Sequence, residues 1–166
     1  MPGEKRTIRK QMIILMLSAV FIFAVDQLTK YIVLSSLSIG ESSPVIKDVF
    51  HITLVHNTGA AFGIMRSSPG IFVIASVAAL LFIAWFMARR FDSIGTLERT
   101  GLTFIFSGTL GNFTDRVRLG YVVDFFDFRI WPVFNVADSF ITSGAIVLAA
   151  AIIFARKKVD NASGSS

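Results

Sequence analysis

The most constraining feature of the sequence is a set of four apolar segments, each close to the length of a membrane span. A helix needs about 20 mostly apolar residues to cross the ~30 Å hydrocarbon layer of a bilayer. The segments therefore predict four transmembrane helices, at residues 12–33, 70–88, 99–117 and 133–155. They leave no stretch long enough for a separate soluble domain, so we expect a single membrane domain over residues 1–166.

The composition agrees with a chain built for lipid, since 54% of its residues are hydrophobic and only 16% are charged. Ordinary globular chains have about 25% charged residues. The absence of Cys excludes disulfides, thiolate catalysis and cysteine-ligated zinc. His51 and His56 lie five residues apart and would point to opposite faces of a strand, so they cannot share a metal. We expect neither a metal nor a cofactor.

The basic residues cluster beside three of the segment boundaries. By the positive-inside rule these clusters face the cytoplasm, and an even number of spans places both termini there. Residues 34–69 and 118–132 then face outward. With most basic residues used for orientation, the net charge of +5 predicts no nucleic-acid partner. The clusters are Lys5, Arg6, Arg9 and Lys10; Arg89, Arg90 and Arg99; and Arg156, Lys157 and Lys158.

The first span has the basic start and apolar stretch of a cleaved signal peptide. However, Val25 is followed by Asp26-Gln27-Leu28-Thr29-Lys30 rather than by a small-x-small cleavage pattern, and apolar residues then resume. We therefore interpret this segment as a helix that remains in the protein.

The outward segments carry signs of local structure. Residues 45–56 are rich in β-branched and aromatic residues and predict one or two short strands. Asn57-Thr58-Gly59 predicts a turn with a positive φ at Gly59; the alternative is an amide loop that pairs with an extended peptide. Residues 124–132 are too apolar for a free aqueous loop and favour the membrane interface, where Trp131 and the Phe residues either belong to an aromatic belt or guide a lipid-bearing substrate.

Ionisable residues inside a span are costly unless they are paired, so each is a candidate for function. Asp26 and Lys30 lie four residues apart on one helix face and are interpreted as a structural salt bridge. Asn112, Asp115 and Arg116 share a face near the outward end of the third span. For Asp115 and Arg116 we favour a clamp between helices.

Asp138 lies in the first turns of the fourth span beside Asn135, with no basic residue near it in sequence. Asp124 lies 14 residues upstream at the same predicted membrane level. Two adjacent carboxylates share a proton and hold an acid and a base together, as in aspartic proteases. The alternatives are that Asp124 caps a turn and that Asp138 serves an ion path.

Other function classes remain open from residue chemistry. A serine–lysine hydrolase would use Lys30 with Ser107 or Ser139, but a Lys30 paired to Asp26 stays protonated and is unsuited as a base. A small proton-linked transporter would use Asp26, Lys30 and Asp138 as a relay, although we find no repeat between the two halves. A non-catalytic scaffold subunit is the third alternative.

Five motifs in order along nearly the whole chain resemble those of bacterial lipoprotein signal peptidases, the signal peptidase II family. The stretch Ser107-Gly108-Thr109-Leu110-Gly111 departs from the Gly-Gly often found there, which concerns local helix packing. The motifs are Asp26-Gln-Leu-Thr-Lys30, Asn57-Thr-Gly-Ala-Ala-Phe62, Gly111-Asn-Phe-Thr-Asp-Arg116, Gly120-Tyr-Val-Val-Asp-Phe125 and Phe134-Asn-Val-Ala-Asp138.

The resemblance implies a four-helix membrane endopeptidase of the bacterial plasma membrane, with its active site near the outer face. It implies cleavage of signal peptides from diacylglyceryl-modified prolipoproteins by an aspartate dyad, Asp124 and Asp138. It also implies a small β-structured cradle at residues 45–65, inhibition by globomycin, contact with membrane lipid and, as we expect, a monomer. The implied supporting residues are Asn57, Gly59, Asn112, Arg116 and Asn135, which line the site, and Asp26, Lys30 and Asp115 behind it.

Overall fold

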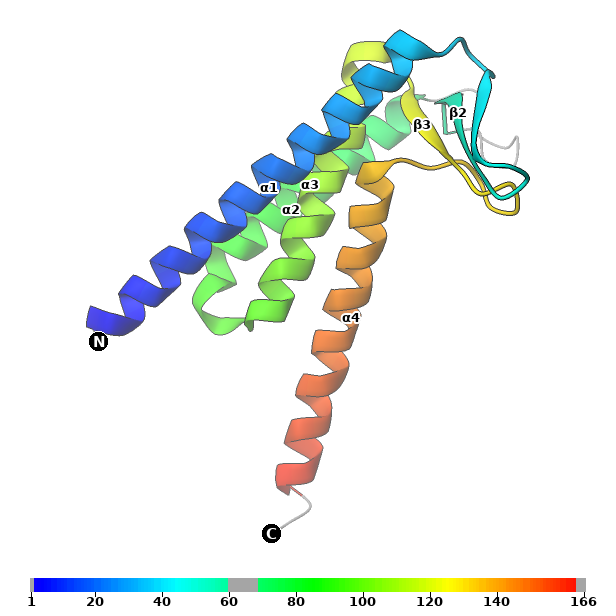
Figure 1. Ribbon diagram of the computed structural model, residues 1–166. Helices are drawn as coiled ribbons and strands as arrows, with labels where there is room; N and C mark the ends of the chain where they lie inside the picture. The colour runs from blue at the N-terminus through cyan, green and yellow to red at the C-terminus, as the bar shows by residue number, and fades with distance from the viewer. Residues whose placement is uncertain (1, 60–68, 164–166) are drawn as a thin grey trace.

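The computed structural model describes residues 2–59 and 69–163. These residues form four long α-helices, one short 3-10 helix and a three-stranded sheet (Figure 1). In chain order the elements are α1 (Pro2–Ser36), β1 (Ser42–Ile46), β2 (Phe50–Asn57), α2 (Pro69–Arg90), η2 (Phe91–Ser93), α3 (Thr96–Leu119), β3 (Val122–Asp127) and α4 (Val136–Ser163).

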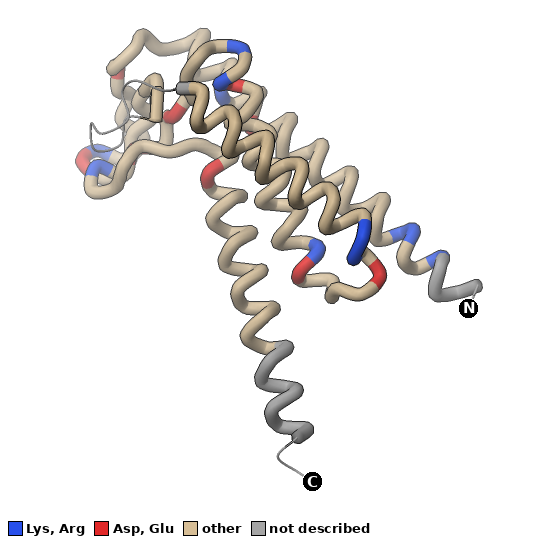
Figure 2. Tube along the Cα trace, turned by 180° about the vertical axis from the view of Figure 1, so that it is seen from behind, with Lys and Arg blue, Asp and Glu red and all other residues tan. Residues whose placement is uncertain are grey.

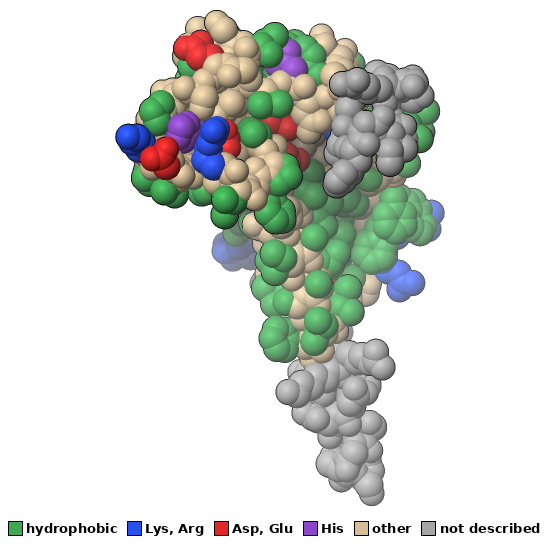
Figure 3. Space-filling model, turned by 90° about the vertical axis from the view of Figure 1, so that its right-hand side faces the viewer, with side chains coloured by type: hydrophobic (Ala, Val, Ile, Leu, Met, Phe, Trp, Pro, Cys, Tyr) green, Lys and Arg blue, Asp and Glu red, His purple; other side chains and the backbone are tan. Residues whose placement is uncertain are grey.

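Three of the helices meet the length and hydropathy expected of a membrane span, over Arg6–Ser36, Gly70–Ser93 and Val136–Phe154. Helix α3 is long enough but contains too many polar residues to meet the same criterion, so a fourth span stays a prediction. The middle of the helices carries few charges, and Lys and Arg gather toward the ends (Figure 2). Hydrophobic side chains cover the described part of the shaft below the sheet (Figure 3). The chain is a multi-pass membrane protein.

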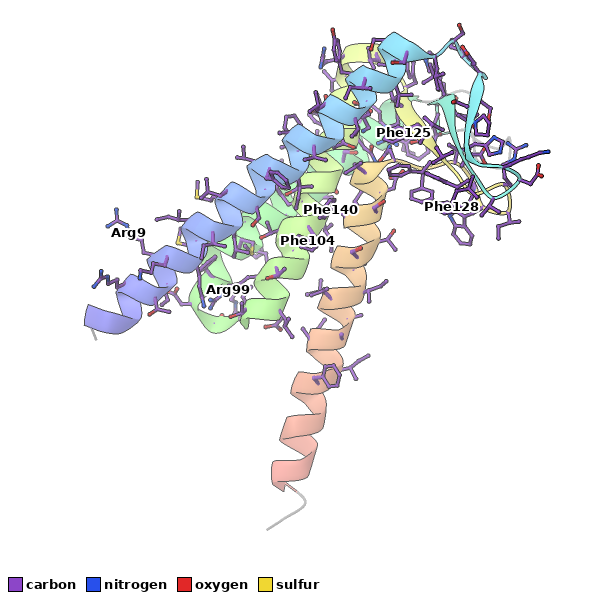
Figure 4. The ribbon with its side chains drawn as sticks, viewed as in Figure 1. Arg9, Arg99, Phe104, Phe125, Phe128 and Phe140 are labelled. Carbon is purple, nitrogen blue, oxygen red and sulfur yellow. The ribbon has the colours of Figure 1, made fainter. Side chains whose placement is uncertain are left out.

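Helices α3 and α4 pack closely because small residues face each other along their contact. A Cβ atom on Gly101 would lie 2.8 Å from the carbonyl oxygen of Gly144, and one on Gly144 would lie 2.7 Å from that of Gly101. Such small residues allow membrane helices to approach. Phe104 and Phe140 then pack edge to face with ring centroids 5.2 Å apart (Figure 4). Helices α3 and α4 are therefore packed against each other as one unit.

The sheet has the order β1-β2-β3 with antiparallel pairing throughout. Strands β1 and β2 confirm the strands predicted around residues 45–56, while residues 60–65 of the predicted cradle lie outside the described residues. The third strand, Val122–Asp127, differs from the sequence prediction, which is only an interfacial segment over residues 124–132. It pairs with β2, which lies about 70 positions earlier in the chain. The residues of the strand alone do not indicate a partner so distant in sequence.

The sheet projects from one end of the helices, and the start of α1 and the end of α4 lie toward the opposite end (Figure 1). A buried apolar cluster joins the sheet to α1 and α4, through Val33, Leu54, Val123, Phe125 and Val136. This cluster fixes β3 against the end of α1 and the start of α4.

Candidate active site

Asp124 lies in β3 with only 1% of its surface exposed, and two asparagine side chains hold its carboxylate. Asn57, the last residue of β2, donates from Nδ2 to Oδ2 of Asp124 at 2.9 Å. Asn135 donates from Nδ2 to Oδ1 at 2.7 Å. Pairing of Val55 with Asp124 across the two strands places Asn57 within reach of this carboxylate. Strand pairing therefore builds half of the site.

Asp138 lies in the first turn of α4, where Asn135 caps the helix. The backbone N–H of Asp138 donates to Oδ1 of Asn135 at 2.9 Å, and the N–H of Asn135 approaches Oδ2 of Asp138 at 3.4 Å. This reciprocal pattern is a capping box with Asp as its third helical residue. The sequence Asn-Val-Ala-Asp thus starts the helix and fixes the second carboxylate together.

The chain between the two aspartates folds back on β3. Phe134 accepts hydrogen bonds from the N–H groups of Phe125 and Phe126 at 3.0 and 2.8 Å, and it donates to the carbonyl of Phe126 at 3.2 Å. The ring of Phe128 stacks on that of Phe134 with centroids 5.9 Å apart. These contacts return the chain to the site, so that Asn135 reaches Asp124.

Asn112 connects the two halves. Its Nδ2 donates to Oδ1 of Asp138 at 2.7 Å, and its Oδ1 accepts from Nδ2 of Asn135 at 3.0 Å. Since Asn135 also donates to Asp124, the two carboxylates are joined through a pair of side-chain amides. The structure thus brings together Asp124 and Asp138, the two residues that the sequence singled out.

The pKa values of the two carboxyl groups of β3, Asp124 and Asp127, are shifted in opposite directions. Burial raises the pKa of Asp124 to about 7; the charge of Asp138 adds to this rise, and hydrogen bonds from Asn57 and Asn135 oppose it. Burial also acts to raise the pKa of Asp127, but hydrogen bonds from Arg129 and Thr53 outweigh it and hold this pKa below its usual value. Asp124 is therefore the carboxyl of the strand that is suited to hold a proton near neutral pH.

Lys30 lies behind the pair in a buried ionic cluster. Its Nζ is 2.9 Å from Oδ2 of Asp26 and 2.8 Å from Oδ2 of Asp115, and it donates to Oδ1 of Asn112 at 3.0 Å. The predicted Asp26–Lys30 pair is confirmed. Gln27, which we did not select although it stands inside the first motif, donates to Asp26 at 3.1 Å and to Asp115 at 3.0 Å.

Asp115 and Arg116 each contact another helix, as predicted for a clamp between helices, but they do so without pairing with each other. In the part of the chain that the structure describes, the ion pair of Asp115 is with Lys30. These adjacent residues point to different sides of α3, and Arg116 lies over the ring of Phe72 in α2, with 5.4 Å from Cζ to the ring centroid. Arg116 also interacts electrostatically with Asp138, Asp124 and Asp115. The guanidinium group of Arg116 therefore places a positive charge near both Asp124 and Asp138.

Gly59 ends the described part of the loop after β2 with φ +82°, as predicted for a turn. Its N–H donates to Oδ1 of Asn57 at 2.8 Å, an Asx-type contact that holds the asparagine amide. A Cβ atom on Gly59 would collide with the ring of Phe72. The turn predicted for Asn57-Thr58-Gly59 is confirmed, and it orients the amide that contacts Asp124. Pairing of this loop with an extended peptide stays a prediction.

The serine–lysine alternative finds no support in these contacts. Ser107 donates to the carbonyl of Thr103 at 2.7 Å, and Ser139 donates to that of Asn135 at 3.0 Å. Both hydroxyls serve their own helices. Within residues 2–59 and 69–163, no group of three or more His, Asp or Glu side chains is arranged to hold a metal ion.

Comparison with known proteins matches residues 18–154 to the family model described as signal peptidase (SPase) II. A lipoprotein signal peptidase of Halothermothrix orenii is 46% identical over 128 residues, covering 76% of this chain and 86% of the relative. One of Clostridioides difficile is 42% identical over 141 residues, covering 84% of this chain and 94% of the relative.

Two solved structures of bacterial membrane enzymes have the same fold. One is 36% identical with a TM-score of 0.75, covering 84% of this chain and 87% of the other. The second is 37% identical with a TM-score of 0.75, covering 83% and 91%. The family model spans most of the chain and the relatives exceed 40% identity, so this chain belongs to the signal peptidase II family of peptidases.

Proposed function

We propose that this chain is an aspartic endopeptidase that cleaves signal peptides from diacylglyceryl-modified prolipoproteins, with Asp124 and Asp138 as its catalytic dyad. The observation that carries the proposal is the amide link between the carboxylates: Asn135 contacts Asp124 at 2.7 Å, and Asn112 contacts both Asn135 and Asp138, at 3.0 and 2.7 Å. A scaffold has no need for such an arrangement. The relatives are named lipoprotein signal peptidases, which supports lipoprotein signal peptides as the substrate class.

The roles of the two aspartates follow from their surroundings. Asp124 holds the proton, because burial raises its pKa to about 7. Asp138 is the general base, because it lies in the first turn of α4 with its carboxylate held by the amide of Asn112 at 2.7 Å. The pair titrates as a unit, so its apparent constants belong to the dyad.

Hydrolysis then needs no covalent intermediate. Asp138 takes a proton from water as the water oxygen attacks the scissile carbonyl carbon, and the proton of Asp124 hydrogen-bonds the carbonyl oxygen. As the C–N bond breaks, the departing nitrogen receives a proton from the dyad. Arg116 balances negative charge beside the reacting atoms, and Asn57 orients the Asp124 carboxylate.

The orientation of the chain supports cleavage near the outer face of the bacterial plasma membrane. Basic residues at the start of α1, the end of α2 and the start of α3 gather at the end away from the sheet (Figure 2). We propose that this end is cytoplasmic, that α3 completes four spans, and that both termini are cytoplasmic. The sheet then lies at the outer face, where a signal-peptide cleavage site leaves the bilayer.

Asp124→Asn and Asp138→Asn test the dyad. Each variant is purified in detergent and assayed on diacylglyceryl-modified and unmodified prolipoprotein, with exposed Asp48→Asn as matched control. We expect each dyad variant to lose more than ~100-fold in rate while remaining folded. Normal cleavage by either variant, or a preference of the wild type for the unmodified substrate, contradicts the proposal. Globomycin is expected to inhibit the wild type, and a monomer is expected in sizing experiments.

A further inference from the structure

Three asparagines present their amide NH2 groups to the carboxylate pair. Asn57 and Asn135 donate to Asp124 at 2.9 and 2.7 Å, and Asn112 donates to Asp138 at 2.7 Å. An amide turned over by 180° would present its oxygen instead of its NH2 group, which breaks the contact at an unprotonated carboxylate such as the base, Asp138. A donor that holds the amide oxygen away from the dyad is therefore needed above all at Asn112.

For two of the three asparagines, a backbone N–H is this donor. The N–H of Gly59 donates to Oδ1 of Asn57 at 2.8 Å. The N–H of Asp138 donates to Oδ1 of Asn135 at 2.9 Å. These donors belong to a turn and to a helix start, so the fold itself sets the direction of both amides.

Asn112 depends on side chains instead. Its Oδ1 accepts from Nζ of Lys30 and from Nδ2 of Asn135, both at 3.0 Å. The two hydrogens of Asn135 Nδ2 are shared with the carbonyl of Val123 at 3.2 Å and with Asp124 at 2.7 Å, so its bond to Asn112 is weakened. Lys30 is the charged donor, and an ammonium group has no acceptor that a turned-over amide could use.

Every hydrogen of the Lys30 ammonium has a partner within 3.0 Å, in Asp26, Asp115 and Asn112. The side chain is only 2% exposed, which holds it in one position. Lys30 therefore acts on Asp138, a carboxylate that it does not itself touch, by holding the amide that contacts it.

We propose that Lys30 is a positioning residue for the hydrolysis, acting on Asp138 through Asn112, whose oxygen it holds so that the amide NH2 points at the Asp138 carboxylate. The inference rests on the proposed function and deepens it. It assigns Lys30 a part in the chemistry in addition to its part in joining helices, because the amide contact favours the ionised form of the base.

A test must distinguish the effect of the Lys30–Asn112 contact from the effect of the charged groups around it. Asp26 from α1 and Asp115 from α3 pair with Lys30, and Arg116 from α3 interacts with both members of the dyad. Lys30 also interacts with Asp124 through charge alone. Removing the lysine by itself therefore changes both the contact and the local charge balance.

The test measures kcat and KM against pH for Lys30→Met, for Lys30→Met with Asp115→Asn, and for the exposed Lys47→Met as control. The double variant removes one positive and one negative charge and keeps the cluster's net charge. Lys30→Met is expected to move the acidic limb of kcat/KM up by about one pH unit and to lower kcat roughly tenfold, with KM within about twofold. The double variant is expected to retain this shift, and Lys47→Met to match the wild type.

A return of the double variant to the wild-type profile would overturn the inference, because charge balance alone would then explain the lysine. An unchanged profile in Lys30→Met would do the same. If the methionine variants do not fold, Lys30→Gln distinguishes the hydrogen bond to Asn112 from the local charge balance, since glutamine keeps an N–H donor without the charge. We expect its acidic limb to stay within about half a pH unit of the wild type; a full shift contradicts the inference. Failure of the proposed function itself would appear separately, as normal cleavage by Asp138→Asn.

Discussion

Asp26, in the middle of α1, accepts a hydrogen bond from the backbone N–H of Ala137 in the first turn of α4, with 2.9 Å between Oδ1 and the nitrogen. The residues are 111 positions apart, and the contact satisfies one of the free N–H groups that every helix start leaves. The other oxygen of Asp26 pairs with Lys30. One buried carboxylate thus caps α4 and holds the ammonium behind the dyad.

Gly111→Ala is expected to break this arrangement. A Cβ atom there would collide with Oδ2 of Asp26, and the aspartate fills the space that the glycine leaves free. We expect a loss of about 1–3 kcal/mol in stability, because the collision displaces a buried, hydrogen-bonded charge. Thermal unfolding in detergent measures it. Gly70→Ala is the control, since a Cβ atom at Gly70 meets nothing within 4 Å; an equal effect of the two substitutions refutes the explanation.

Gly59→Ala is expected to lower kcat more than Gly40→Ala does. The two glycines have φ of +82° and +80°, so alanine suffers the same backbone strain at both. Only at Gly59 does the new Cβ atom meet a neighbour, the ring of Phe72. Displacing this turn withdraws the N–H that orients Asn57. We expect a fall of roughly tenfold beyond the control in steady-state assays, and similar rates for the two variants would contradict the role of the turn.

The electrostatics of Asp124 predict a pH-dependent stability difference. Its pKa is raised by burial to about 7 from an ordinary 3.8, so the folded protein holds this proton more tightly than the unfolded chain. The stability from this group is full below the ordinary value and is lost as the pH rises through about 7. Asp124→Asn lacks this loss. Its Tm relative to the wild type should therefore rise between about pH 5 and about pH 8.

The exposed Asp48→Asn is the control for that measurement, and its Tm difference should stay flat over the same pH range. Parallel curves for Asp124→Asn and the wild type would show that the buried carboxyl does not titrate as described.

The sequence was sufficient for the long helices and for singling out Asp138 as a candidate because both depend on local signals, whereas the dyad itself stays a prediction. Spans follow from apolar length, and Asp138 stands out in an apolar helix without a cation nearby. The strand that carries Asp124 escaped prediction because its partner, β2, is distant in the chain and its residues lack alternation. The partner of Asp115 escaped for a related reason: whether it faces Lys30 depends on the rotation of α3 against α1, which no sequence spacing within α3 encodes.

The apolar segment after β3 predicts two separable effects. Phe128 packs between the rings of Phe50 and Phe134, at 4.8 and 5.9 Å between centroids, and Phe134 precedes the asparagine that caps α4. Phe128→Ala is therefore expected to lower Tm and kcat together. Trp131 is 69% exposed, so its ring is free to meet lipid or the substrate's diacylglyceryl group. We expect Trp131→Ser to raise KM several-fold for the lipid-modified substrate, with Tm and kcat unchanged. If neither variant alters KM or rate, this segment takes no part in holding or covering the substrate.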